Sequence, residues 1–215
     1  MLSVLRKLFG KRVSAGGSAG NAIENFKPEL LIIGLGNPGG RYSGTRHNIG
    51  FDVIDGVCAG NGVEAPRKYY CSAECREAAF GVNNKPVLLV KPLTYMNLSG
   101  EAVGALADKY RLSPAECLVV VDDFNIPLGK IRIRKDGAHG GHNGLKSISA
   151  AIGSDYPRLR VGIGPLPAGV TITDFVLGHF DTNEREAVSK VINTAVEAVR
   201  YVIENDIDTA MNRYN

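Results

Sequence analysis

The segment LIIGLGNPGGRYSGTRHN, residues 31–48, carries the strongest structural signal in the sequence. It begins as an apolar run, continues with five glycines and a proline, and ends on His47 and Asn48. Glycine and proline at this density do not suit a packed helix or strand, so the residues after Ile33 are predicted to form a shaped loop. The segment therefore predicts a buried strand, followed by a loop whose backbone can approach a ligand closely.

Similar apolar runs recur along the chain. Residues 30–33, 86–90 and 117–121 are continuous apolar runs, which are typical of strands buried on both faces. Residues 130–134 and 158–163 instead alternate charged with aliphatic side chains, and this pattern predicts strands that carry charge on one face.

Helical patterns separate these strands. The spacing of apolar residues predicts helices over residues 49–59, 101–110, 143–152 and 183–204, the last one behind a cap formed by Asp181 to Glu184. Strands that alternate with helices predict a single α/β domain, in which helices flank both faces of a mixed, largely parallel, twisted sheet.

Length and composition limit the class of protein. The chain has 215 residues, of which 44% are hydrophobic and 22% charged, and its formal net charge is +3. These values fit one globular domain, predicted over residues 28–215, behind a flexible basic arm over residues 1–27. No apolar run in the sequence approaches the roughly 20 residues that span a bilayer. We therefore expect a soluble cytoplasmic protein, with an organellar targeting peptide in the arm as the alternative.

The four cysteines favour a reducing compartment, because the chain is far longer than a disulfide-stapled miniprotein. Cys71 and Cys75 have the wrong spacing for a CxxC redox pair, and neither Cys58 nor Cys117 belongs to a second pair that would complete a zinc site. We expect all four to be structural.

The glycine-rich loop matches G-x-G-x-x-G at residues 34–39, so a dinucleotide site has to be considered. That site needs a helix N-terminus at the third glycine, but Pro38 and the glycines after it delay the next helix by about ten residues. Asp52 and Asp55, near the distance expected for a ribose ligand, fall inside that helix. We therefore expect no nicotinamide or flavin cofactor.

Polar side chains follow several of the predicted strands, and His47 is the most reactive of them. A carboxylate at the end of a neighbouring strand can hold a histidine in the tautomer whose free nitrogen accepts a proton. Asp122 and Asp123 follow the run 117–121, and Asp122 is the better placed, although the sequence leaves open which carboxylate faces His47. Three loop asparagines offer uncharged donors and acceptors in comparable positions: Asn37, Asn97 and Asn143.

His139 and His142, in the pattern H-x-x-H, could supply half of a metal site. The glycines around the two residues break the helix that would align their rings, and a full ligand set is missing from the sequence. We expect no metal.

Four segments together resemble the signature motifs of bacterial-type peptidyl-tRNA hydrolases. These are GLGNPGGRYSGTRHNIGF, KPLTYMNLSGEAV, VVVDDFNIPLGKIRIR and GGHNGLKSI, in the family's order and with similar spacing. The resemblance covers residues 31–212. It implies a monomeric α/β enzyme that hydrolyses the ester between a stalled peptide and the 3′ ribose of tRNA, without a cofactor or an obligate protein partner.

The resemblance also implies roles for individual residues. His47 is similar to the family's general base, Asp122 to the acid that supports it, and Asn37 to a residue that helps to place the substrate. Two positions depart from the family pattern, since Val121 stands where histidine is frequent and Asn125 where aspartate is common. Positions similar to those that contact the tRNA end or the peptide, or line the same site, are Tyr42, Tyr95, Met96, Asn97, His142 and Asn143.

Basic side chains near the alternating strands are predicted to hold tRNA phosphates. Arg134 and Arg160 resemble the family's tRNA clamp positions. The full predicted patch is Arg132, Arg134, Lys135, Lys146, Arg158 and Arg160. Some relatives of this fold serve instead as plastid RNA-splicing factors, so a non-catalytic RNA-binding protein is the alternative function.

Overall fold

The computed structural model describes residues 26–59 and 66–215, so most of the predicted N-terminal arm lies outside the described residues. A seven-stranded sheet forms the centre of the fold. Its strands are β1 (Leu30–Gly34), β2 (Lys68–Tyr70), β3 (Ala73–Phe80), β4 (Lys85–Pro92), β5 (Cys117–Pro127), β6 (Ile131–Arg134) and β7 (Arg158–Gly164).

The strand order is β2-β3-β4-β1-β5-β7-β6. The central strands β4, β1, β5 and β7 are parallel to one another, while β3 and β6 run antiparallel to their inner neighbours and β2 runs antiparallel to β3. The predicted mixed, largely parallel sheet is confirmed. Because the carboxyl ends of the parallel strands meet at one edge, the loops that follow them are brought together there.

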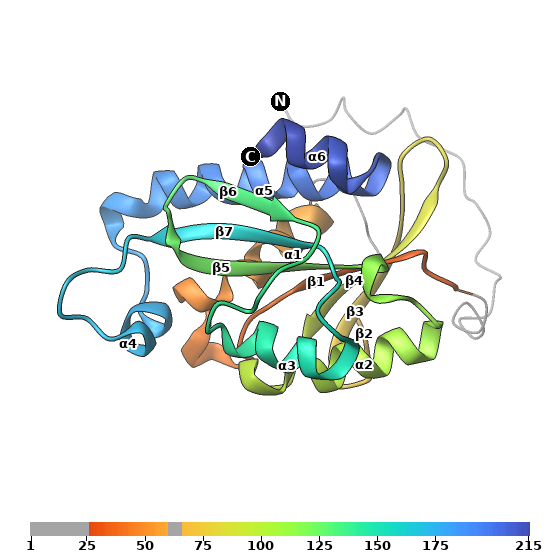
Figure 1. Ribbon diagram of the computed structural model, residues 1–215, viewed down its shortest axis with the longest axis horizontal. Helices are drawn as coiled ribbons and strands as arrows, with labels where there is room; N and C mark the ends of the chain where they lie inside the picture. The colour runs from red at the N-terminus through yellow and green to blue at the C-terminus, as the bar shows by residue number, and fades with distance from the viewer. Residues whose placement is uncertain (1–25, 60–65) are drawn as a thin grey trace, which may run out of the picture.

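Helices cover both faces of the sheet, as expected (Figure 1). One face packs against α1 (Ile49–Ala59), α5 (Arg185–Glu204) and α6 (Ile207–Tyr214), and the other against α2 (Ser99–Tyr110) and α3 (Asn143–Ile152). A short helix, α4 (Ile172–Leu177), lies at the carboxyl end of the sheet. None of the described helices has the length and hydrophobicity needed to cross a membrane.

The predicted helices agree closely with the observed ones. The ranges 49–59 and 143–152 are confirmed at both ends, and the second helix starts two residues earlier than expected, at Ser99. The predicted cap before the last helix is a reciprocal capping box between Asp181 and Glu184, which precedes α5 through a short 3-10 turn.

Several elements were not predicted. The β2–β3 hairpin escapes the pattern because its charged residues are partly buried on both faces and pair within the sheet, as Lys68 does with Glu77 at 2.5 Å. The helices α4 and α6 are too short to show a clear apolar period. Strand β5 continues past its apolar run to Pro127, through an irregularity after Asp123.

The prediction that Arg158 belongs to the basic patch that holds phosphates was wrong. Its relative exposure is 0%, because β7 lies between β5 and β6 and is covered on both faces. Its guanidinium donates hydrogen bonds to the carbonyl oxygens of Gly137, Ser154 and Tyr156. Arg158 is therefore a core cation, and it ties the segment after β6 back against β7.

The glycine-rich segment packs backbone against backbone at the start of α1. A Cβ atom on Gly34 would lie 2.2 Å from the carbonyl oxygen of Gly50, and a Cβ on Gly50 would lie 2.5 Å from the nitrogen of Leu35. Only glycine permits this approach, which places the start of α1 directly beside the end of β1.

We predict that Gly50→Ala lowers the free energy of unfolding by about 1–3 kcal/mol, because the added methyl group overpacks rigid backbone. Gly104→Ala in α2 is the matched control, since its Cβ would meet only the Ala151 methyl at 3.4 Å. It should be neutral, or stabilising by up to about 1 kcal/mol through helix propensity. Urea denaturation measures both, and equal stability of the two variants would contradict the close approach.

Candidate active site

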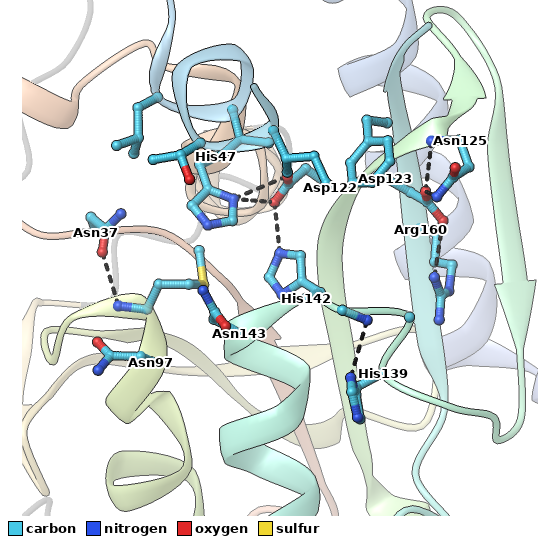
Figure 2. Close-up of a pocket in the computed structure, with 18 residues that line it drawn as sticks. Asn37, His47, Asn97, Asp122, Asp123, Asn125, His139, His142, Asn143 and Arg160 are labelled. Atoms are coloured by element: carbon cyan, nitrogen blue, oxygen red, sulfur yellow. Dashed lines mark hydrogen bonds and ion pairs between the residues drawn. The ribbon is translucent and has the colours of Figure 1, made fainter. Parts of the chain in front are cut away.

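The glycine-rich loop ends in a 3-10 turn, Arg46–Asn48, whose three side chains are all buried. A 3-10 turn has three residues per turn, so successive side chains point about 120° apart. Arg46, His47 and Asn48 therefore reach three different parts of the structure, and His47 points into a cleft at the carboxyl end of the sheet (Figure 2).

His47 forms a close pair with Asp122 on β5. Its Nδ1 lies 2.9 Å from Oδ1 and 3.0 Å from Oδ2 of the carboxylate. Asp123 does not face His47; it lies 2.9 Å from the Arg160 guanidinium and accepts hydrogen bonds from Asn125. Successive side chains of a strand point to opposite faces, which explains why the two adjacent carboxylates have different partners.

His142 is the second partner of Asp122. Its Nε2 lies 3.0 Å from Oδ1 of Asp122, and its Nδ1 caps α3 by accepting a hydrogen bond from the Leu145 N–H at 3.3 Å. Because Nδ1 must accept, neutral His142 carries its hydrogen on Nε2 and donates it to the carboxylate. The imidazole rings of His47 and His142 lie 4.9 Å apart.

These contacts determine the charge of Asp122. Burial by itself raises the pKa of this carboxyl, but the charges and hydrogen bonds of His47 and His142 outweigh burial and hold the pKa well below its usual range. Asp122 is therefore an anion at neutral pH and accepts the Nδ1–H of His47. The Nε2 lone pair of His47 remains available to accept a proton.

The same cluster places three possible metal-ligand atoms, from His47, Asp122 and His142, within 4.8 Å of one another. A metal on Nε2 of His142 would move the ring hydrogen to Nδ1, where it would face the Leu145 N–H. We therefore interpret the cluster as a hydrogen-bonded base. His139, the other residue considered for a metal, accepts the Gly141 N–H through its Nδ1 and lies outside the cluster.

Asn48 holds the loop after β1, in which Asn37 lines the cleft. Its side chain accepts the Asn37 N–H at 2.8 Å and donates to the Asn37 carbonyl at 3.0 Å. Asn37 in turn accepts the Met96 N–H through Oδ1 at 2.9 Å, so the loops after β1 and β4 are joined. The role of Asn48 was not predicted, although its place beside His47 and among the loop asparagines was a usable signal.

The cleft has a volume of about 470 Å³ and gathers most of the predicted site residues. Amide side chains of Asn97 and Asn143 lie at its exposed margin, and residues of α4 form an apolar wall. The predicted residues that line it are Asn37, His47, Met96, Asn97, Asp122, His142, Asn143 and Arg160.

Tyr42 and Tyr95 do not line the cleft. They form an edge-to-face pair with ring centres 6.5 Å apart, and Tyr95 is 57% exposed. The Arg41 guanidinium lies over the Tyr42 ring at 4.7 Å. These residues make an exposed aromatic surface beside the His47 loop.

The basic residues separate into two groups. Arg160 lines the cleft, and its guanidinium donates hydrogen bonds of 2.9 Å to Asp123 and to the Ala138 carbonyl oxygen. Arg132 and Arg134 are exposed on the edge strand β6, opposite Arg160 and Arg158 in the register, and neither lines the cleft. Among the described residues, Arg134 is therefore exposed, whereas Arg160 already pairs with Asp123.

The cysteines are poor candidates for nucleophiles. Cys58, Cys75 and Cys117 are buried, and none of the four forms a disulfide within the described residues. Burial raises the pKa of the Cys75 and Cys117 thiols to about 12, so both stay protonated at neutral pH.

We predict that Asn48→Ala lowers the free energy of unfolding by about 1–3 kcal/mol, because it leaves the buried N–H and C=O of Asn37 without partners. Asn193→Ala on the exposed face of α5 is the control and should change stability by less than about 0.5 kcal/mol. Chemical denaturation of both variants measures the difference. A loss no larger than that of the control would show that Asn48 does not hold the Asn37 loop.

Comparison with known proteins gives a consistent result. The family model described as peptidyl-tRNA hydrolase matches residues 31–215. A peptidyl-tRNA hydrolase of Fervidobacterium nodosum is 48% identical over 186 residues, which cover 86% of this chain and 96% of the relative. One from Clostridium perfringens is 44% identical over 187 residues, covering 86% and 97%. The crystal structure of the Acinetobacter baumannii peptidyl-tRNA hydrolase aligns with a TM-score of 0.79 at 33% identity, over 86% of this chain and 94% of that one.

Proposed function

Since the chain belongs to the peptidyl-tRNA hydrolase family, we propose that it hydrolyses the ester between a peptide, or an N-blocked amino acid, and the 3′ ribose of tRNA. The observation that carries this proposal is the His47–Asp122 pair, at 2.9 Å, in the floor of the cleft. It supplies a general base, and an activated ester needs little more than a base and a positioned water.

In the proposed reaction, Nε2 of His47 takes a proton from a water as that water attacks the ester carbonyl. The tetrahedral intermediate collapses, the bond to the ribose oxygen breaks, and the His47 imidazolium returns the proton to that oxygen. Asp122 stabilises the imidazolium through Nδ1. Because the pKa of Asp122 is low, the carboxylate does not itself take the proton. The products are a free peptide and tRNA with a 3′-terminal hydroxyl.

Amide groups would support the other charges of the reaction. A carbonyl oxygen becomes an oxyanion during the attack, and preorganised N–H donors stabilise it. The Oδ1 of Asn37 is already held by Met96, so we assign the Nδ2 of Asn37 to this role. Asn97 and Asn143, at the exposed margin, are assigned to the peptide and the terminal ribose.

The tRNA is proposed to lie across the exposed surfaces beside the cleft. Tyr42 and Tyr95 offer aromatic faces to unpaired bases, because base stacking on aromatic side chains tolerates different sequences. Arg134 offers an exposed cation to a phosphate. Arg160 would have to exchange Asp123 for a phosphate, so its contribution to binding should be smaller than its charge suggests.

We also propose that the protein is a monomer, that it acts in the cytoplasm, and that it needs neither a cofactor nor an obligate protein partner. The alternative of a non-catalytic RNA-splicing protein gains no support from the site, because RNA binding does not need a buried histidine–aspartate pair. We therefore retain the hydrolase.

We predict that His47→Asn lowers kcat by roughly 10²–10⁴-fold, the usual contribution of a general base. Release of tRNA from N-acetyl-aminoacyl-tRNA is the measurement. Asn193→Ala is the control and should keep the wild-type kcat, because Asn193 is exposed on α5 and does not line the cleft. An inactive wild type, or a His47→Asn variant as active as wild type, would refute the hydrolase.

We predict that Arg134→Ala weakens tRNA binding and reduces the slope of log affinity against log salt by about one, as expected for one lost phosphate contact. Arg67→Ala is the control, since Arg67 is an exposed arginine next to β2, at the opposite edge of the sheet. Filter binding over a series of salt concentrations measures the slopes. If both variants keep the wild-type slope, Arg134 does not contact the tRNA.

A further inference from the structure

Arg46, the residue before His47, is a buried cation in an unusual environment. Its relative exposure is 6%, and its Nη2 lies 2.8 Å from Glu184. The centre of the guanidinium lies 4.7 Å from the Phe175 ring centre and 4.6 Å from the Phe180 ring centre. The planar cation is thus held by two aromatic rings and one carboxylate.

The polar atoms of Arg46 explain why an arginine is needed there. Nε and Nη1 are buried and have no hydrogen-bond partner within the described part of the chain. Buried donors without partners are rare, and here the electron-rich faces of the two rings take the place of hydrogen-bond acceptors. A lysine could keep the charge beside Glu184, but it lacks a flat group that can contact both rings.

Both rings belong to the segment that forms one wall of the cleft. Phe175 is in α4, whose next two residues, Val176 and Leu177, line the cleft beside the base. Phe180 lies just after α4. The backbone adds two links, because the Arg46 N–H donates to the Gly178 carbonyl at 3.0 Å and Thr45 pairs with His179.

Few side chains of helix α4 itself pack against the rest of the protein. The helix has six residues, which is too short for a helix to be stable without tertiary contacts. Its first three residues are exposed, and the inward contacts come from Phe175, Val176 and the half-buried Leu177. The Arg46 guanidinium, packed on Phe175 and Phe180, therefore joins this wall to the turn that carries the base, together with the backbone links and the His179 ring, whose Nδ1 lies 3.2 Å from the Gly44 carbonyl oxygen.

We infer that Arg46 is a positioning residue that holds the α4 wall at a fixed distance from His47, so that the base and the wall enclose the substrate together. The inference rests on the proposed hydrolase function. Arg46 does not line the cleft; it acts through Phe175 and Phe180 on the wall and through the backbone of the turn on His47. Losing it should change both the binding of substrate and the chemical step.

Kinetics with N-acetyl-aminoacyl-tRNA test the inference, at a temperature well below the unfolding midpoint of every variant. Arg46→Met should raise KM and lower kcat on the order of 10- to 100-fold, the scale of a misplacement of about 1 Å. Arg46→Lys should recover part of the loss. Phe180→Leu should act in the same direction, and its effect should not add to that of Arg46→Met, because both changes break the same contact.

Arg76→Met is the matched control. Arg76 pairs with Glu74 at 3.4 Å on β3 and lies away from the cleft, so its loss should leave kcat and KM unchanged even if stability falls. Hydrogen exchange adds a readout that does not depend on activity. Amides of residues 175–180 should lose protection in Arg46→Met and keep it in Arg76→Met.

The outcomes separate the two proposals. Unchanged exchange in residues 175–180 of Arg46→Met would overturn the inference whatever the activity. Increased exchange with wild-type kcat and KM, in an active enzyme, would also overturn it, because the anchor would then be structural only. A wild type that does not release tRNA would refute the hydrolase function and the positioning role with it, while the exchange result would still report whether Arg46 anchors α4.

Discussion

The buried carboxylate of Asp122, which lies within 3.0 Å of two imidazole nitrogens, is the contact on which the site depends. A carboxylate with 4% exposure cannot remain charged without strong hydrogen-bond donors. His47 and His142 supply those donors from two segments that are far apart in the sequence. Satisfying one buried anion therefore brings the glycine-rich loop and the start of α3 to the end of β5, and it leaves His47 in the tautomer that can act as a base.

The turn Arg46–Asn48 extends this constraint to both walls of the cleft. Its three side chains point in three directions, so a single turn contacts three different segments. Arg46 holds the aromatic rings near α4, His47 binds the floor, and Asn48 holds the loop that contains Asn37. The close approach of Gly34 to Gly50 fixes the turn relative to β1. One local 3-10 turn thus directs three adjacent side chains into three separate long-range contacts.

The sequence was sufficient to predict the helices and strands whose local apolar pattern agrees with their burial in the fold. The central parallel strands and the helices of residues 49–59 and 143–152 have strong periodicity, and structure follows it. Arg158 looked like a surface cation because alternation cannot tell a solvated face from one that another segment of the chain covers. The sequence favoured Asp122 over Asp123, and the structure places Asp122 beside His47; the role of Asn48 depended on contacts to backbone atoms, which leave no trace in composition.

The different partners of the two adjacent carboxylates also make the catalytic cluster compatible with the proposed binding of a polyanion beside it. Asp122 and Asp123 both carry negative charge, which would repel phosphates within a Debye length of about 8–10 Å. Asp122 is enclosed by hydrogen-bond donors and is almost fully buried, while Arg160 neutralises Asp123 at 2.9 Å. Opposite strand faces make this division possible, because each carboxylate meets a different partner. The exposed Arg132 and Arg134 can then dominate the charge of the surface proposed to bind tRNA, although the His47–Asp122 pair requires an anion.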